Sequence, residues 1–211
     1  MKLAIFGASG GIGEFIVKHA LDKSYTVNAY VRSPAKFNIL HEQLTIIKGE
    51  LNDYKNIKST IKGCDAVISS LGCPMKWTYE GTAVLDGHKN IVRAMEELGL
   101  SRFIGLATPS VKFAKDKSSF ATIVPGIIAG IVFPKAKKEI IAVANTITNS
   151  TLNWTIVRIL APKDTPYTGN VKTSFGDIKI DFNISREDIA VFMLDQVENN
   201  EFSHSMPIIG S

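Results

Sequence analysis

Three glycines at intervals of three residues follow the first apolar run of the chain. The run is Leu3–Phe6, and the glycines are Gly7, Gly10 and Gly13 within the sequence GASGGIG. Glycine loses more conformational freedom on folding than any other residue, so a tight backbone or a close ligand must justify so many of them. A strand, a glycine-rich turn and a helix in this order are typical of the turn that holds the pyrophosphate of a dinucleotide.

The glycines of this turn have different geometric tasks. Gly7 permits the sharp turn away from the strand, Gly10 lets the backbone approach a pyrophosphate, and Gly13 lets the helix pack closely on the strand. The free N–H groups at the start of the helix, and the positive end of its dipole, then face the phosphates. The residues that we expect to bind the pyrophosphate are Gly7, Ser9, Gly10, Gly11, Ile12 and Gly13.

Short apolar segments alternate with longer amphipathic segments along the rest of the chain. We expect strands at Lys2–Phe6, Thr26–Val31, Thr45–Lys48, Ala66–Ser70, Arg102–Ala107, Trp154–Arg158 and Met206–Ile209. We expect helices at Ile12–Leu21, Tyr54–Ile61, Thr82–Leu98, around Lys137–Ile147 and at Arg186–Glu198. Gly99 is the expected C-cap of the third helix, and Ser185 is the expected N-cap of the last. This alternation predicts a doubly wound Rossmann-type α/β fold, in which a mostly parallel, seven-stranded sheet carries helices on both faces.

The size and charge of the chain limit what this fold can bind. Its 211 residues, 45% of them hydrophobic, fit one domain over residues 1–211. Ligands of open α/β sheets bind beyond the carboxyl ends of the strands, so we expect the loops around 109–135 and 159–181 to complete the ligand side. The net charge of +4 comes from scattered lysines without an arginine-rich stripe, and we therefore expect no nucleic-acid partner.

The sequence shows neither the ligand spacing of a metal site nor an apolar stretch long enough to span a membrane. Cys64 and Cys73 lack metal-type spacing and no histidine cluster accompanies them, so we expect reduced thiols and no metal site. The longest apolar stretch, Phe120–Phe133, is too short for a membrane span and is interrupted by Pro125. The N-terminal apolar run is too short for a signal peptide. We expect a cytoplasmic protein without a membrane partner, either a monomer or a homodimer.

The end of the second expected strand bears on the choice of dinucleotide. Proteins that favour NAD usually place an acid there, on the ribose 2′-hydroxyl. No Asp or Glu occurs between Lys23 and His41, and Arg32 and Ser33 stand at the strand end with Lys36 one turn further on. A guanidinium can bind a 2′-phosphate with two hydrogen bonds and can stack on adenine. The sequence therefore predicts NADP(H) in preference to NAD(H).

Six segments spread over nearly the whole chain resemble one family. They are KLAIFGASGGIG, VRSPAKF, KGELND, DAVISSLG, LNWTIVR and ISREDIAVFMLD. Together they are similar to the atypical short-chain dehydrogenases/reductases, and within that group to the NmrA-like NAD(P)H-binding proteins and the flavin-reductase and biliverdin-reductase-B-like proteins. The resemblance implies a Rossmann fold that binds NAD(P)H.

The resemblance also implies further cofactor contacts after the later strands. Glu50 and Leu51 of GELND would meet the adenine, although the family more often has Asp at the first position. The segment Ser69–Gly72 would line the ribose side, and Leu160–Pro162 would flank the nicotinamide. Ile159 stands where the family commonly has proline. The cofactor residues implied in this way are Glu50, Leu51, Ser70, Leu71, Gly72, Ala107, Thr108, Leu160 and Pro162.

A Tyr-x-x-x-Lys pair, the usual proton-transfer device of short-chain dehydrogenases, is missing where that chemistry needs it. The one such string, Tyr54 to Lys58, follows the third strand on the adenine side, and we do not assign it a catalytic role. The expected helix after the fifth strand contains no tyrosine. Thr108 is our candidate catalytic residue, because it follows the fifth strand, and Ser110 is the alternative hydroxyl beside it.

Two functions remain open on these residues. The first is an NADPH-dependent oxidoreductase whose small-molecule acceptor, a flavin, quinone or similar conjugated molecule, takes its proton from water. The second is a non-catalytic, redox-sensing regulator that binds NADP(H) and acts through a protein partner. The apolar segment 120–133 fits a lid, a docking surface or a buried helix, and Trp77 and Tyr79 fit either acceptor stacking or a core or interface role. A sugar epimerase would need more chain than the roughly fifty residues after WTIVR.

Overall fold

A mostly parallel sheet of eight strands forms the centre of the molecule in the computed structural model, which describes residues 1–211 apart from the side chain of Lys36. In spatial order its strands are β3 (Leu44–Lys48), β2 (Thr26–Val31), β1 (Lys2–Phe6), β4 (Ala66–Ser69), β5 (Arg102–Ala107), β6 (Asn153–Arg158), β10 (Ile208–Gly210) and β8 (Lys172–Ser174). A second sheet pairs β7 (Ala161–Lys163) with β9 (Asn183–Ser185). The helices are α1 (Gly13–Asp22), a short 3₁₀ turn η1 (Pro34–Lys36), α2 (Tyr54–Ile61), α3 (Ala83–Leu98), α4 (Phe120–Val132), α5 (Pro134–Thr148) and α6 (Arg186–Asp195).

The strand order confirms the doubly wound topology. β1 pairs in parallel with β2 on one side and β4 on the other, so the chain direction across the sheet reverses at this point. Ligands of such sheets bind at this reversal, beyond the carboxyl ends of the strands. The sheet has one strand more than the seven predicted. The eighth, β8, pairs antiparallel with β10 and comes from a stretch of the chain that reads as loop because it is short and rich in turn residues.

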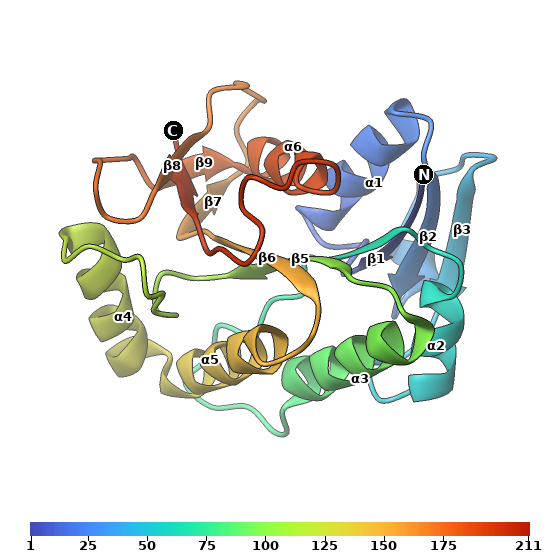
Figure 1. Ribbon diagram of the computed structural model, residues 1–211, viewed down its shortest axis with the longest axis horizontal. Coiled ribbons are helices and arrows are strands. Elements are labelled where there is room, and N and C mark those ends of the chain that lie inside the picture. Colours follow the sequence, from blue (N-terminus) through green and yellow to red (C-terminus); the bar gives the residue numbers. More distant parts are fainter.

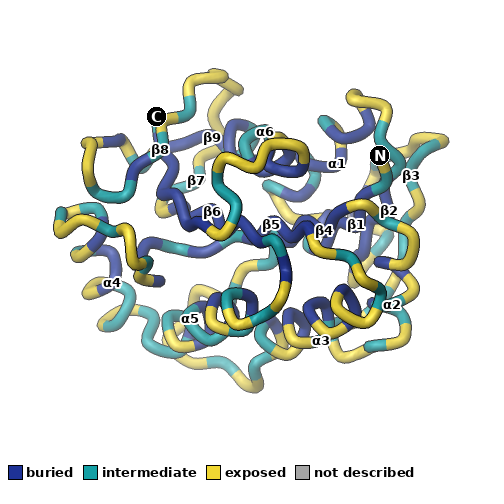
Figure 2. The backbone as a smooth tube through the Cα atoms, viewed as in Figure 1, coloured by how far each residue is buried: buried dark blue, intermediate teal, exposed yellow. Residues whose placement is uncertain are grey.

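The helices cover both faces of the sheet, as predicted. Figure 1 shows α1 and α6 above the sheet and α2, α3 and α5 below it. Side chains of a strand point alternately to the two faces, so Leu3 and Ile5 pack under α1 and α6, whereas Ala4 and Phe6 pack on the other side. The central strands are consequently buried over nearly their whole length (Figure 2), which is why they read as continuous apolar runs.

Two helix ends follow their sequence signals closely. Gly99 ends α3 in the left-handed conformation, with φ of +67°, as its position after the amphipathic run predicts. Ser185 begins α6, and its hydroxyl accepts a hydrogen bond from the backbone N–H of Asp188 at 2.9 Å. Gly99 thus ends α3 shortly before β5 begins at Arg102, and Ser185 joins β9 directly to α6.

The apolar segment after β5 forms α4, but this helix is not buried. Only Thr122, Pro125 and Gly126 are buried among its thirteen residues. Figure 1 shows α4 beyond the end of α5, away from the stack of helices under the sheet. The interpretation of the segment as a buried helix is therefore wrong. No helix in the described part of the chain has the length and apolar character needed to cross a membrane.

Candidate functional site

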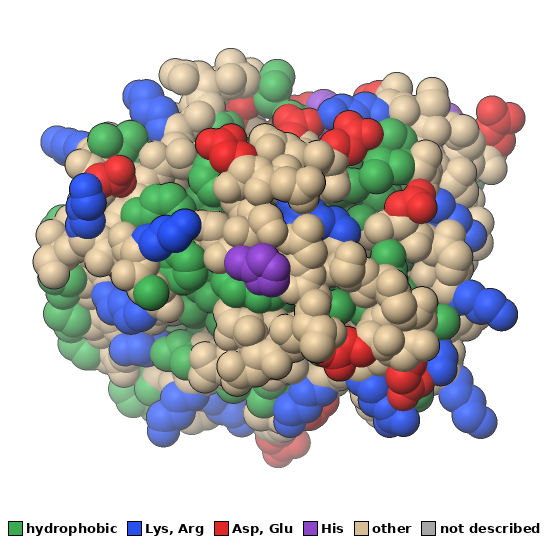
Figure 3. All heavy atoms as spheres, in the orientation of Figure 1, with side chains coloured by type: hydrophobic (Ala, Val, Ile, Leu, Met, Phe, Trp, Pro, Cys, Tyr) green, Lys and Arg blue, Asp and Glu red, His purple; other side chains and the backbone are tan. Residues whose placement is uncertain are grey.

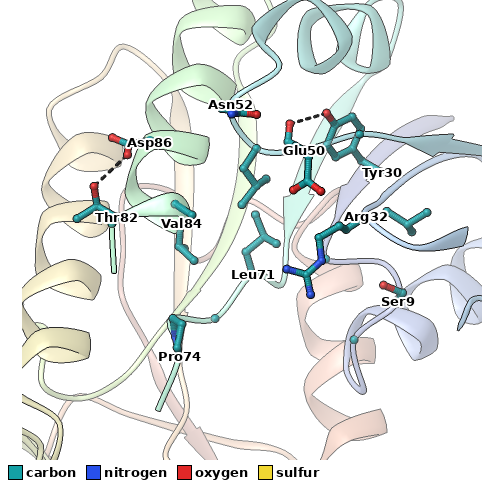
Figure 4. Close-up of a pocket in the computed structure, with 18 of the residues that line it drawn as sticks. Ser9, Tyr30, Arg32, Glu50, Asn52, Leu71, Pro74, Thr82, Val84 and Asp86 are labelled. Carbon is teal, nitrogen blue, oxygen red and sulfur yellow. Dashed lines mark hydrogen bonds between the residues drawn. The ribbon is translucent and has the colours of Figure 1, made fainter. Parts of the chain in front are cut away.

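A cleft of about 910 Å³ opens at the carboxyl edge of the sheet, at the reversal between β1 and β4 (Figure 4). Its walls come from the glycine turn, the ends of β2 and β3, the segment after β4 and the start of α3. Ten predicted cofactor residues line it: Gly7, Ser9, Gly10, Arg32, Ser33, Glu50, Leu51, Ser70, Leu71 and Gly72. Segments that are far apart in the sequence thus meet in one concave surface, whose volume lies within the usual range of small-molecule and cofactor pockets.

The backbone of the glycine turn leaves no room for side chains at two positions. Gly7 has φ of +79°, a conformation that favours glycine, and its carbonyl oxygen accepts a hydrogen bond from the N–H of Gly10 at 2.9 Å. A Cβ on Gly13 would lie 2.1 Å from that same carbonyl oxygen. A Cβ on Gly10 would stand 3.2 Å from it, which is tight but possible. Gly13 therefore serves the fold, while Gly10 lies at the cleft surface.

The three other predicted turn residues lie beside the cleft rather than in its wall. Gly11, Ile12 and Gly13 are not among its lining residues, and α1 begins at Gly13 with Ile12 as its cap. The side chain of Arg186, at the start of α6, crosses the turn here, because a Cβ on Gly11 would lie 2.9 Å from the Arg186 Cδ. Arg186 also forms an ion pair with Asp164. Sequence reasoning missed this cation, since 175 residues separate it from the turn.

Arg32 projects from the end of β2 into the cleft. Figure 4 shows its guanidinium between Leu71 and Ser9. No carboxylate of the described chain lies within ion-pair distance of this side chain, so its five donors remain available to a ligand. The carboxylate of Glu50 lines the same end of the cleft. The side chain of Lys36, which the sequence placed near this end, lies outside the described part of the structure.

Tyr30 shapes the wall beneath Arg32. Its hydroxyl donates a hydrogen bond to the carbonyl oxygen of Glu50 at 2.8 Å, and it fills the space that a side chain on Gly49 would need. Burial, with the nearby charges of Asp53 and Glu50, raises the pKa of Tyr30 to about 12, so it remains a neutral hydrogen-bond donor. The tight fit of Tyr30 against Gly49 explains the glycine after β3, which the sequence analysis left unexplained.

A buried carboxylate holds the opposite wall of the cleft. Glu139 of α5 is 3% exposed and accepts hydrogen bonds from the backbone N–H groups of Val84 and Leu85 at 3.0 Å each. It also accepts a hydrogen bond from the Tyr79 hydroxyl at 2.5 Å. The ammonium of Lys135 lies 4.6 Å from the Tyr79 ring centre and donates to the Tyr79 backbone carbonyl. These bonds tie the segment after β4 to α5 and satisfy the free N–H groups of α3.

Tyr79 therefore has a structural role in this wall, where the sequence left a stacking role and a core or interface role open. Burial and the bond to Glu139 raise the pKa of its hydroxyl above the ordinary value, which keeps it protonated. Burial, together with the charge of Glu139, also raises the pKa of the nearby Cys73 thiol to about 12. Cys73 is thus an unreactive thiol at neutral pH.

Comparison with known proteins agrees with this cleft. The sequence profile described as NAD(P)H-binding matches residues 7–200, which include the glycine turn and every wall of the cleft. The chain belongs to the NAD(P)H-binding family. Protein YMR090W of Saccharomyces cerevisiae is 27% identical over 208 residues, which cover 93% of this chain and 87% of the yeast protein. Cinnamoyl-CoA reductase 1 of Petunia hybrida is 31% identical over 112 residues, and this match covers 48% of this chain but only 33% of that enzyme.

Solved structures of other Rossmann proteins share the fold of this NAD(P)H-binding protein. A short-chain dehydrogenase/reductase from Veillonella parvula in complex with NADP has a TM-score of 0.79 at 18% identity, with coverage of 100% of this chain and 94% of the other. ChuY, an anaerobilin reductase from Escherichia coli O157:H7, also has a TM-score of 0.79 at 18% identity, covering 100% and 97%. The Rossmann fold and the NAD(P)H-binding family that the sequence predicts are thus confirmed.

The remaining predicted residues of this NAD(P)H-binding protein lie outside the cleft. Ala107, Thr108, Leu160 and Pro162 are not among the lining residues. Thr108 is half-buried after β5, and its hydroxyl lies 2.5 Å from that of Ser110. Tyr54, of the rejected Tyr-x-x-x-Lys string, begins α2 and does not line the cleft either.

A buried ion pair fixes the segment that carries Thr108. Arg158, at the end of β6, is completely buried and binds both carboxylate oxygens of Asp116 at 2.7 and 2.6 Å. The Arg158 guanidinium also donates to the backbone carbonyls of Val111 and Met206 at 3.0 and 2.8 Å. The arginine of the WTIVR motif thus anchors the segment between β5 and α4, a role that the sequence analysis did not assign.

Proposed function

We propose that the protein is an NADPH-dependent reductase of the atypical short-chain type, which transfers hydride to a flavin, quinone or similar conjugated small molecule. The observation that carries the proposal is Arg32, a cation without an acidic partner, in a family cleft built around a glycine turn. The names of the fold neighbours, which include an NADP complex and an anaerobilin reductase, support the same class.

In this proposal, the residues of the cleft fit NADP(H). Gly10 keeps the surface open for the pyrophosphate, and the start of α1 directs its N–H groups toward it. Arg32 and Ser33 bind the 2′-phosphate, with the guanidinium supplying two parallel hydrogen bonds. Glu50 and Leu51 meet the adenine, and Ser70–Gly72 the adjoining ribose. The reduced nicotinamide, when bound, supplies the hydride.

Orientation is the main contribution that the residues near the acceptor can make. Ala107, Leu160 and Pro162 flank the nicotinamide end in this proposal, and the Thr108 and Ser110 hydroxyls hold an amide or carbonyl oxygen there. α5, the helix after α4, carries Lys135 and Glu139, and both are engaged with Tyr79. The acceptor therefore takes its proton from water, which suits flavins and quinones because they are reduced without a strong protein acid.

One assay tests both the reaction and the preference for NADPH. The purified protein is mixed with NADPH or NADH and a panel of flavins and quinones, and oxidation of the cofactor is followed by absorbance. We expect saturable turnover that favours NADPH. Because charge-assisted hydrogen bonds contribute about 1.5–3 kcal/mol each, Arg32→Ala should weaken NADPH binding by at least roughly tenfold and NADH binding much less.

The matched control is Arg93→Ala, which removes an exposed guanidinium on α3 that pairs with Glu97 away from the cleft. This variant should bind both cofactors like the wild type. Equal losses for NADPH and NADH in Arg32→Ala would refute the 2′-phosphate assignment. Tight NADPH binding without turnover on any acceptor would refute the reductase and favour the redox-sensing regulator.

A further inference from the structure

Helix α4 presents an apolar face with no partner in the structure. Its exposed residues include six large hydrophobic side chains, with exposed fractions between 42% and 70%: Phe120, Ile123, Ile127, Ile128, Ile131 and Val132. Figure 3 shows hydrophobic side chains gathered over this part of the molecule, at the left of the view. Contiguous apolar patches on a soluble protein usually mark an interaction surface. We call these six residues the α4 face.

The α4 face is one continuous stripe rather than scattered exposure. Positions 120, 123, 127 and 131 recur at intervals of three and four residues, which places them on one side of the helix. The buried residues, Thr122, Pro125 and Gly126, lie on the other side, where Gly126 approaches Ser110. No residue of the stripe carries a charge or a hydrogen-bonding group. The surface is therefore apolar and without a polar group that could fix the orientation of a specific partner.

Lysines border both ends of the stripe. Residues 112–119 and 133–138, which flank α4, contain six lysines and one acid, Asp116. The lysines are Lys112, Lys115, Lys117, Lys135, Lys137 and Lys138. Asp116 is neutralised by Arg158. Two of these cations are engaged, since Lys135 binds the Tyr79 carbonyl and Lys137 donates to the Gly126 carbonyl at 2.7 Å. The others are exposed.

A groove of about 850 Å³ beside the first turn of α4 extends this surface. It is lined in part by Phe120, Ile178, Lys172 and Lys179. Two acids, Asp177 and Asp181, also line it, and each accepts hydrogen bonds from neighbouring groups of its own loop. The surroundings of the α4 face thus combine exposed apolar side chains with an excess of positive charge.

We propose that the α4 face docks the protein on the surface of a lipid bilayer that contains anionic phospholipids. The aliphatic stripe would enter the boundary between headgroups and acyl chains, and the flanking lysines would bind lipid phosphates. Thirteen helical residues extend only about 20 Å, which is short of the roughly 30 Å hydrocarbon core, so the helix lies on the membrane rather than across it. The short apolar stretch excludes a membrane span but does not exclude docking on the membrane surface.

Two other occupants fit these observations less well. A second copy of the chain, related by a two-fold axis, would place the same lysine-bordered patch on both subunits and oppose like charges. A protein partner would usually meet a surface with Tyr, Trp, Arg or Met at its centre, and the α4 face has none of these residues. A fluid anionic surface needs no shape complementarity. The inference stands apart from the proposed reductase, although the inner side of α4 touches Ser110.

Flotation with lipid vesicles tests the docking. The wild type is mixed with vesicles of phosphatidylcholine alone, or with 30 mol% (about one lipid in three) phosphatidylglycerol, at low and high salt. We expect flotation with the anionic vesicles, reduced at high salt because the lysine contribution is screened. The double variant Ile127→Glu/Ile131→Glu should lower the partition coefficient at least roughly tenfold, since two large apolar side chains are lost from the interface. Lys117→Gln should lower it about fivefold.

The matched control is Leu40→Glu, the same kind of change at an exposed leucine outside the α4 face. It should float like the wild type. Circular dichroism checks that each variant is folded, and the comparison of neutral with anionic vesicles needs no variant at all. Wild-type protein that stays with the soluble fraction in both lipid mixtures refutes the proposal. So does sedimentation equilibrium that shows a dimer dissociated by Ile127→Glu/Ile131→Glu, because the occupant would then be a second copy.

Discussion

The two halves of the carboxyl edge are built in different ways. Around β1 to β4, the cleft depends on close backbone contacts, such as that between Gly13 and the Gly7 carbonyl, and a charged group, Arg32, lines its wall. Around β5 and β6, the corresponding charges, Arg158 and Asp116, are buried and bind each other. The first half keeps a cation available, whereas the second uses its ion pair to hold a loop.

Under the proposed function, this difference separates the binding of the cofactor from the binding of the acceptor. A rigid turn with free N–H groups and an open cation recognises phosphates, whatever the reaction. The β5 side has a hydroxyl pair, Thr108 and Ser110, on a segment fixed by Arg158, and beyond it an exposed helix. That half can vary its surface without disturbing the cofactor cleft. It is the half in which the acceptor and the surroundings of the protein would be selected.

The largest expected effect tests the ion pair of the β5 side. Asp116→Ala leaves the completely buried guanidinium of Arg158 without its carboxylate, and such a loss typically destabilises a protein by about 3–5 kcal/mol. Urea unfolding followed by circular dichroism measures the free energy of unfolding. The exposed pair of Lys23 and Asp195 provides the control, because Asp195→Ala should change that free energy by no more than about 1 kcal/mol. Similar losses in both variants would show that the β5 side is not held by its ion pair.

Much of the cofactor half was predictable from the sequence because its signals are local. The glycine turn lies within seven consecutive residues, and Arg32 stands directly at a strand end. Strand and helix order followed from apolar periodicity, and the capping roles of Gly99 and Ser185 from their positions. Each of these depends on neighbours a few residues away, which is the range over which sequence pattern is informative.

The contacts that the sequence could not indicate are long-range. Glu139 reaches the start of α3 across 55 residues, and Arg186 crosses the glycine turn from the other end of the chain. The edge strand β8 has three residues, too few for a recognisable period. A lid, a docking surface and a buried helix all remained possible for α4 because it is apolar on all sides, and only tertiary structure shows that most of its large side chains are exposed.

A smaller effect distinguishes fold from ligand within the glycine turn. Gly13→Ala would place its Cβ 2.1 Å from the Gly7 carbonyl oxygen, so the turn must shift and we expect about 1–3 kcal/mol of destabilisation. Gly10→Ala should leave the free energy of unfolding nearly unchanged, since its Cβ would stand 3.2 Å from that oxygen. It should nevertheless weaken NADPH binding at least roughly tenfold, because the methyl group faces the pyrophosphate.

Thermal unfolding and cofactor titration of the two variants give this separation directly. Gly130→Ala in α4 is the control: its Cβ would meet only the flexible Lys137 side chain, and a helical Gly→Ala change should stabilise by about 0.5–1 kcal/mol. If Gly10→Ala lost stability and kept its cofactor affinity, Gly10 would belong to the fold and the contrast with Gly13 would disappear.

The smallest expected effect concerns His88, which lies at the boundary between the two halves. His88 of α3 is buried, and its two ring nitrogens lie 3.0 Å from the Ser69 hydroxyl and 2.7 Å from the Val84 carbonyl oxygen. Burial lowers the pKa of His88 below its usual 6.5, so the folded protein holds the ring neutral. Near and below pH 6.5 the His88 ring binds a proton in the unfolded chain but not in the folded chain. The free energy of unfolding therefore falls as the pH falls.

We therefore expect the free energy of unfolding to drop by up to about 1.4 kcal/mol between pH 7.5 and 5.5 through this one group, because at most one proton is taken up only on unfolding. His88→Gln should lose this part of the pH dependence, and His41→Gln, at an exposed histidine, should keep it. Urea unfolding at the two pH values measures the difference. A pH dependence that is unchanged in His88→Gln would mean that the pKa of His88 is the same in the folded and unfolded chains. It would contradict a neutral, buried imidazole between Ser69 and Val84 at the boundary of the two halves.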